Sequence, residues 1–64
     1  MLRIELTVDE AAEVVRVLEG YLSDLRYEIS DTDSASYKEQ LRAEKGVVME
    51  ALAKLRSALE PAHV

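Results

Sequence analysis

Several residue types that commonly stabilise small proteins or carry chemistry are missing or scarce in this chain of 64 residues. It has no cysteine, one histidine, one proline and two glycines. The absence of cysteine excludes disulfides, thiol catalysis and cysteine-based zinc sites. A chain this short buries a modest share of its surface, so without disulfides we expect oligomerisation to complete its core. The lack of cysteine also suits a reducing cytoplasm, which is where we expect the protein.

Long apolar runs are absent as well. Asp9, Glu10 and Glu13 lie where the apolar core of an export signal would be. A membrane-spanning helix needs about 20 mostly apolar residues in succession, and no stretch of the sequence provides them. We therefore expect neither an export signal nor a membrane partner.

Positive charge is scarce, with 8 Lys and Arg against 13 Asp and Glu and a net charge of −5. Nucleic-acid binding depends on clustered Lys and Arg, so we expect no nucleic-acid partner. The charge is also unevenly spread, at −6 in residues 1–33 and +1 in residues 34–64. The two halves therefore attract each other weakly when they pack together.

The first half of the chain has the pattern of a short extended segment followed by a long helix. Residues 2–6 alternate apolar and polar side chains, which is the period of a strand. The sequence Thr-Val-Asp-Glu from Thr7 is a capping box, so we expect a helix from Val8 to about residue 30. Its apolar residues recur at steps of three and four, as in a heptad stripe. They are Val8, Ala11, Val15, Leu18, Leu22, Leu25 and Ile29.

The second half predicts a turn and another helix. Five small polar residues from Ser30 to Ser34 favour caps and turns, so we expect a turn at about 31–33. A second helix is predicted at about 34–60, and a tail at 61–64, because Pro61 cannot continue a helix. The apolar face of this helix is formed by Tyr37, Leu41, Val48, Leu52, Leu55 and Leu59.

One continuous helix of about 50 residues is the alternative, and the phase of the apolar stripe tests it. Extending the first stripe by sevens from Ile29 reaches Ser36, Ala43 and Glu50. None of these lies on the apolar face of the second helix. The stripe restarts out of phase, so the sequence predicts an all-α fold with one domain, an antiparallel two-helix hairpin spanning residues 1–64.

A fold about residues 31 and 32 opposes residues whose numbers sum to about 63. Leu22 would then lie opposite Leu41, and Val15 opposite Val48. The extended segment 2–6 would lie beside Leu55 and Leu59 of the second helix, or pair with the same segment of a neighbouring copy.

Each predicted helix also carries a second apolar strip beside its main stripe. Single apolar residues on a surface need no explanation. A lone hairpin, however, would leave both strips in water, whereas two hairpins would bury them in a four-helix bundle. We therefore expect a homodimer, or a tetramer, whose interface residues are Val14, Val17, Tyr21, Val47, Ala51 and Ala58.

Three further residues lie away from the apolar stripes. Gly20 and Gly46 fall inside the predicted helices, where each costs about 1 kcal/mol relative to alanine. Close contact with a partner would explain them, and tolerance at the surface explains them equally well. Tyr27 is either an anchor for another protein or a side chain that lies along its own helix.

Asp24, Glu28 and Asp31 are the candidate metal ligands, because their spacing places three carboxylates on one helix face near the turn. The same face is the predicted solvent side of the first helix, so a solvated acidic surface is the favoured interpretation. His63 lies beyond Pro61, and the serines have no positioned base nearby. We expect no cofactor and no enzymatic activity.

The segment YLSDLRYEISDTD, at residues 21–33, resembles a segment of short bacterial proteins that form a helical hairpin and have no assigned activity. The resemblance implies a hairpin and a bacterial cytoplasmic setting, and it transfers no functional residue. The favoured function is a small homo-oligomeric module for protein–protein interaction, which binds itself or another protein. The alternatives are a metal- or small-molecule-binding bundle that uses the acidic cluster, and an antitoxin-like regulator.

Overall fold

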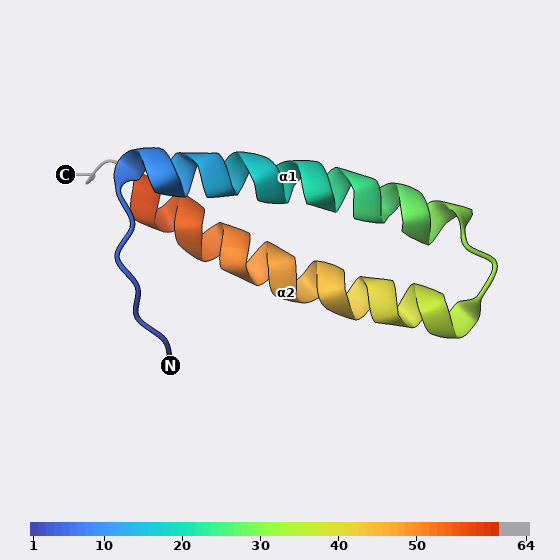
Figure 1. Cartoon of the computed structure of the whole chain (residues 1–64). Coiled ribbons are helices and arrows are strands. Elements are labelled where there is room, and N and C mark those ends of the chain that lie inside the picture. Colours follow the sequence, from blue (N-terminus) through green and yellow to red (C-terminus); the bar gives the residue numbers. More distant parts are fainter. Residues whose placement is uncertain (61–64) are drawn as a thin grey trace.

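The computed structural model describes residues 1–60, so the predicted tail 61–64, with Pro61 and His63, lies outside the described residues. Two helices make up most of the chain, α1 (Val8–Asp31) and α2 (Ala35–Leu59). They pack against each other as an antiparallel pair, and Figure 1 shows the connecting loop at one end of a long, narrow molecule. The predicted all-α hairpin is confirmed. The helix bounds differ by one residue from the predicted ends at 30, 34 and 60.

Local hydrogen bonds explain where α1 begins. The Thr7 hydroxyl accepts a hydrogen bond from the Glu10 amide at 3.0 Å, and the Glu10 carboxylate accepts one from the Thr7 amide at 2.8 Å. Two amides that a helix N-terminus would otherwise leave unpaired are thus satisfied. The acidic side chains of Asp9 and Glu10 also lie at the positive end of the helix dipole. The predicted capping box is present.

The turn is held by small polar side chains, as its composition predicts. The Thr32 amide donates to the Glu28 carbonyl at 3.0 Å and ends α1. Ser34 is the N-cap of α2, and its hydroxyl accepts from the Tyr37 amide at 3.3 Å. The Thr32 hydroxyl also accepts from the Ser34 amide at 3.3 Å. The chain therefore reverses within three residues.

Burial follows a heptad pattern along both helices. The buried and half-buried residues of α1 and α2 form what we call the seam, and every other helical residue is exposed. Val8 and Tyr37 were predicted to belong to the apolar faces but are 73% and 46% exposed. The seam consists of Ala11, Val15, Leu18, Leu22, Leu25 and Ile29 on α1, and Lys38, Leu41, Lys45, Val48, Leu52, Leu55 and Leu59 on α2.

Hydrogen bonds between the helices indicate how α1 and α2 are aligned. Hydrogen bonds join Tyr21 to Glu44 and Tyr37 to Glu28 on one side of the seam, and both pairs of residue numbers sum to 65. On the other side Arg56 bonds to Glu19, a pair that sums to 75. Figure 1 shows the two helices ending at about the same level at both ends of the molecule, and the residue numbers of these ends sum to 66 and 67. Opposed residues therefore sum to about 66, which is close to the predicted sum of about 63.

Leu22 and Leu41, which were predicted to lie opposite each other, belong to one buried core cluster together with Leu25 and Leu52. Leu22 and Leu52 also line one surface hollow together with Met49.

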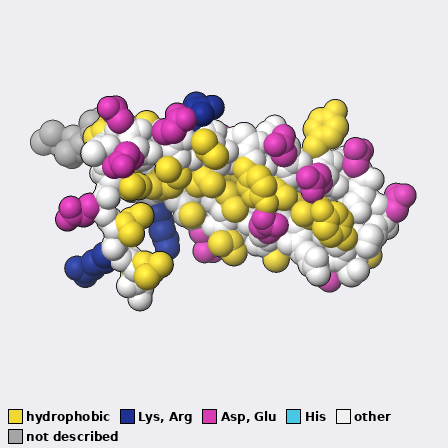
Figure 2. All heavy atoms as spheres, viewed as in Figure 1, with side chains coloured by type: hydrophobic (Ala, Val, Ile, Leu, Met, Phe, Trp, Pro, Cys, Tyr) yellow, Lys and Arg dark blue, Asp and Glu magenta, His cyan; other side chains and the backbone are white. Residues whose placement is uncertain are grey.

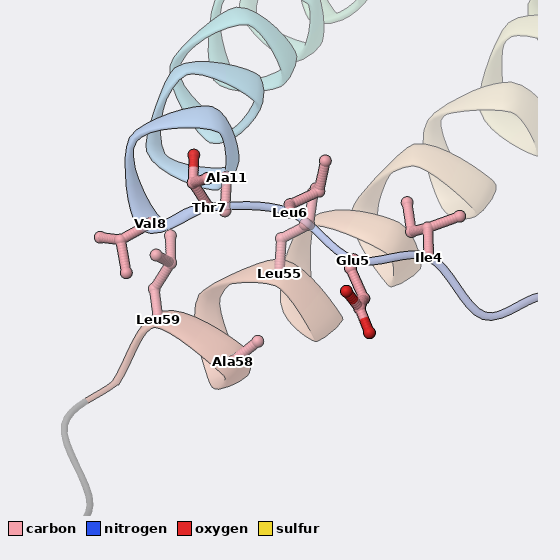
Figure 3. Close-up of a pocket in the computed structure, with 9 residues that line it drawn as sticks. All are labelled: Ile4, Glu5, Leu6, Thr7, Val8, Ala11, Leu55, Ala58 and Leu59. Carbon is pink, nitrogen blue, oxygen red and sulfur yellow. The ribbon is translucent and has the colours of Figure 1, made fainter.

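The N-terminal segment, residues 1–7, forms neither helix nor strand, and no strand is found anywhere in residues 1–60. It crosses the end of α2 (Figure 1), and Figure 3 shows Leu6 close to Leu55. Ile4 and Leu6 line a hollow of about 480 Å³ together with Leu55 and Leu59. The segment therefore lies beside the end of α2, which is one of the two positions predicted for it.

Candidate interaction surface

The hairpin has a small core and an unusually large surface. Its buried residues are Ala11, Leu22, Leu25, Leu41 and Leu52. The accessible surface is 5543 Å², whereas a compact monomer of this mass exposes about 4,100 Å². Part of the excess follows from the elongated shape, with extents of 46 × 24 × 22 Å. The remaining question is where on this surface the exposed apolar side chains lie.

One side of the seam, which we call the tyrosine flank, carries most of the large apolar side chains that the two helices expose. Its residues repeat at intervals of three, four or seven along each helix, so they share one face. The Tyr21–Glu44 and Tyr37–Glu28 hydrogen bonds show that the strips of the two helices lie on the same side of the hairpin. The tyrosine flank consists of Val14, Val17, Tyr21 and Glu28 on α1, and Tyr37, Glu44, Val47, Ala51 and Ala58 on α2.

All six residues predicted from the sequence to form a dimer interface lie on the tyrosine flank. Among the four large side chains of this set, Val17 and Val47 are the most exposed, at 53% and 68%, and both lie near the middle of their helices. In the view of Figure 2 an apolar stripe follows the groove between the two helices. Lys and Arg side chains appear on that face only in the half nearer the termini.

Two tyrosine–carboxylate pairs cross the seam in the half of the tyrosine flank nearer the turn. The Tyr21 hydroxyl donates to Glu44, and the Tyr37 hydroxyl donates to Glu28 at 3.3 Å. The hydrogen bond to Glu44 raises the pKa of Tyr21 above its ordinary value, and partial burial adds to the shift. The negative charge of Glu28 likewise raises the pKa of Tyr37. Each carboxylate therefore stabilises the neutral form of a phenol.

The opposite side of the seam, which we call the arginine flank, is charged. It carries Glu19 and Arg26 on α1, and Arg42, Met49 and Arg56 on α2. Arg56 forms an ion pair with Glu19 across it, and both side chains are about half exposed. Apolar and neutral aromatic groups thus dominate the tyrosine flank, whereas guanidinium groups dominate the arginine flank.

The acidic triplet Asp24, Glu28 and Asp31 does not gather into one site. Within residues 1–60 no group of three His, Cys, Asp or Glu side chains is placed so that it could hold a metal ion. Glu28 accepts the hydrogen bond from Tyr37 described above. The three residues share a helix face, as their spacing predicts, but the hairpin adds no further ligand to them.

Two features of this surface were not predicted. Glu44 and Tyr37 join the tyrosine flank only once the register of the hairpin is known, although their seven-residue spacing places both on one face of α2. The second feature is a hollow lined by Leu2, Ile4 and Ala51, where the N-terminal segment adjoins α2. The alternation of residues 2–6 was its only signal in the sequence.

The wider comparisons add no assignment. No helix within residues 1–60 is long and apolar enough to cross a membrane. None of the family models, curated proteins and solved structures compared with the chain matches it. The surface itself is therefore the basis for a functional proposal.

Proposed function

We propose that this protein is a non-catalytic, self-associating interaction module in which a second copy covers the tyrosine flank and completes a four-helix bundle. One observation carries the proposal. Five of the eight large apolar side chains that the helices expose lie on this single flank. They are Val14, Val17, Tyr21, Tyr37 and Val47.

The size of the flank supports a second copy as its occupant. A stable interface of standard size buries about 800 Å² on each partner. The hairpin is 46 Å long and more than 20 Å wide, so one side of it can supply that area. In a symmetric dimer the same patch meets itself, and the apolar centre around Val17 and Val47 suits such contact.

The composition of the flank supports the same occupant. Near the middle of the helices it presents small and β-branched side chains, such as Val14, Val47 and Ala51, which allow two helices to approach closely. Bundles of this kind bury their apolar strips between helices that run nearly parallel or antiparallel. We propose a cytoplasmic setting for the module on the sequence grounds given above.

Sedimentation equilibrium tests the proposal directly. We expect a dimer at micromolar concentrations, with a thermal unfolding midpoint that rises with protein concentration because association favours the folded state. A stably folded monomer, with a midpoint independent of concentration, would contradict the proposal.

A charge placed at the centre of the flank provides a sharper test. Val47→Lys should convert the dimer to a monomer, because a buried, unpaired ammonium group is costly. The matched control is Ala43→Lys, which adds the same charge to an exposed position of α2 on the outer face, four residues earlier. We expect the control to remain dimeric. Equal effects of the two substitutions would show that the flank has no special role.

A further inference from the structure

The tyrosine flank contains two carboxylates that a second copy would have to cover. Glu44 accepts a hydrogen bond from Tyr21, and Glu28 accepts one from Tyr37. All four side chains are exposed in the single hairpin. They lie near one another, since the charge of Glu28 also acts on Tyr21 and the charge of Glu44 on Tyr37.

No cation neutralises these two carboxylates within the described chain. Ion pairs within 4.0 Å in residues 1–60 are Glu13–Arg16 and Glu19–Arg56, so neither Glu28 nor Glu44 has a basic partner at that distance.

The other charged groups around the pair come from both helices. Asp24 and Asp31 lie within one turn of Glu28 on α1 and add negative charge. Arg26 on α1 and Arg42 on α2 each lie two residues from one of the two glutamates, but both belong to the arginine flank. Lys38 and Lys45 occupy half-buried seam positions. The tyrosine flank itself thus carries carboxylates and no base.

A carboxylate that loses water without gaining a cation becomes easier to protonate. In a symmetric dimer the same two glutamates of the second copy would add further negative charge to the interface. A protonated carboxyl group has no charge to desolvate and can itself donate a hydrogen bond.

We infer that self-association through the tyrosine flank takes up protons at Glu28 and Glu44, so that acid favours the bundle and neutral or alkaline pH favours the single hairpin. The inference rests on the proposed function. Its sign follows from linkage, because the dimer holds these protons more tightly than the monomer does. The added affinity is present at low pH and is lost as the pH rises and these carboxyl groups give up their protons.

The experiment is sedimentation equilibrium of the full chain at about pH 5 and about pH 7.5, at constant ionic strength. We expect the dimer dissociation constant to be lower at the acidic pH by about tenfold or more, because four carboxyl groups, two from each copy, take part. Far-UV circular dichroism at both pH values separates a change in folding from a change in association.

The decisive variant is the double substitution Glu28→Gln and Glu44→Gln. Glutamine keeps the shape and the acceptor for each tyrosine hydroxyl but carries no charge. We expect this variant to dimerise at both pH values with nearly equal dissociation constants. The matched control Glu50→Gln, on the outer face of α2, should keep the pH dependence of the original chain.

The possible outcomes separate the two proposals. A dimer whose dissociation constant is the same at both pH values would overturn the proton-linked inference and leave the proposed self-association standing. The same holds if the glutamine variant keeps the full pH dependence. A chain that stays monomeric at both pH values, in its original form and as the glutamine variant, would overturn both.

Discussion

Arg56 of α2 forms an ion pair with Glu19 of α1 on the flank opposite the two tyrosines. The two residues are 37 positions apart in the sequence, so their contact depends on the register of the hairpin. This ion pair lies on one side of the seam, and the two tyrosine–carboxylate pairs lie on the other side. Residues outside the core thus report how the two helices are aligned.

This ion pair should contribute little to stability but should reveal the register. Because both side chains are half exposed, we expect Glu19→Arg to lower the free energy of unfolding by no more than about 1 kcal/mol at low salt. The reciprocal variant, Glu19→Arg with Arg56→Glu, should recover most of the loss. Thermal unfolding in low and high salt measures both effects. If the reciprocal variant is no more stable than the single one, the two residues are not paired.

Leu52 should be among the most sensitive positions, because it is only 3% exposed and belongs to the apolar core. Truncation of a buried leucine costs about 2–5 kcal/mol, which is comparable to the whole stability of a chain of this length. We expect Leu52→Ala to lose most of its helix signal at 25 °C in circular dichroism. Met49→Ala, on the exposed arginine flank, is the control and should remain folded.

The features of the fold that could be predicted from the sequence are local ones. The capping box at Thr7 and the apolar spacing along α1 depend on residues within two turns of each other. Lys38 and Lys45 show where this approach fails. A lysine stem can cover apolar surface while its ammonium group reaches water, so a seam position is not always marked by an apolar residue. Conversely, Tyr37 was predicted to lie on the apolar face because of its residue type and spacing, but its side chain is 46% exposed.

The interaction surface likewise combines features that the sequence predicts with features that depend on how the helices pack. The positions of the six predicted flank residues could be derived from the sequence because each lies on one side of the apolar stripe of its own helix. The Tyr21–Glu44 and Tyr37–Glu28 pairs could not, because their partners are 23 and 9 residues apart and meet only in one register. A shift of one heptad would separate both pairs. Proton uptake at these pairs could therefore be inferred only from the structure.

Both glycines should tolerate alanine. A methyl group added at Gly20 or Gly46 would meet nothing within 4 Å, and neither residue has a positive φ angle. Because alanine favours helix more than glycine does, we expect Gly46→Ala to raise the free energy of unfolding by about 0.5–1 kcal/mol. Urea unfolding at a fixed protein concentration measures it. A loss of stability or of self-association would instead mean that a partner packs closely against this residue.

The tyrosine–carboxylate pairs should weaken the fold in alkali. The pKa values of Tyr21 and Tyr37 are raised above the ordinary value of 10.0, so the folded chain holds these protons more tightly than the unfolded chain. The stabilisation is present below about pH 10 and is lost as the pH rises through the raised values. We expect the unfolding midpoint to fall more steeply above pH 10 than in the double variant Tyr21→Phe and Tyr37→Phe. Parallel curves would contradict the shift.

Lys45 offers a way to strengthen the seam. It is half-buried between Leu41 and Val48, one turn from each, at a position that leucine would fill with apolar contacts. We expect Lys45→Leu to raise the free energy of unfolding by about 1–2 kcal/mol through added apolar burial. Lys54→Leu, at an exposed position of the same helix, should change it little. Chemical unfolding of both variants at matched concentration compares them, and an equal gain at Lys54 would show that Lys45 does not occupy the seam.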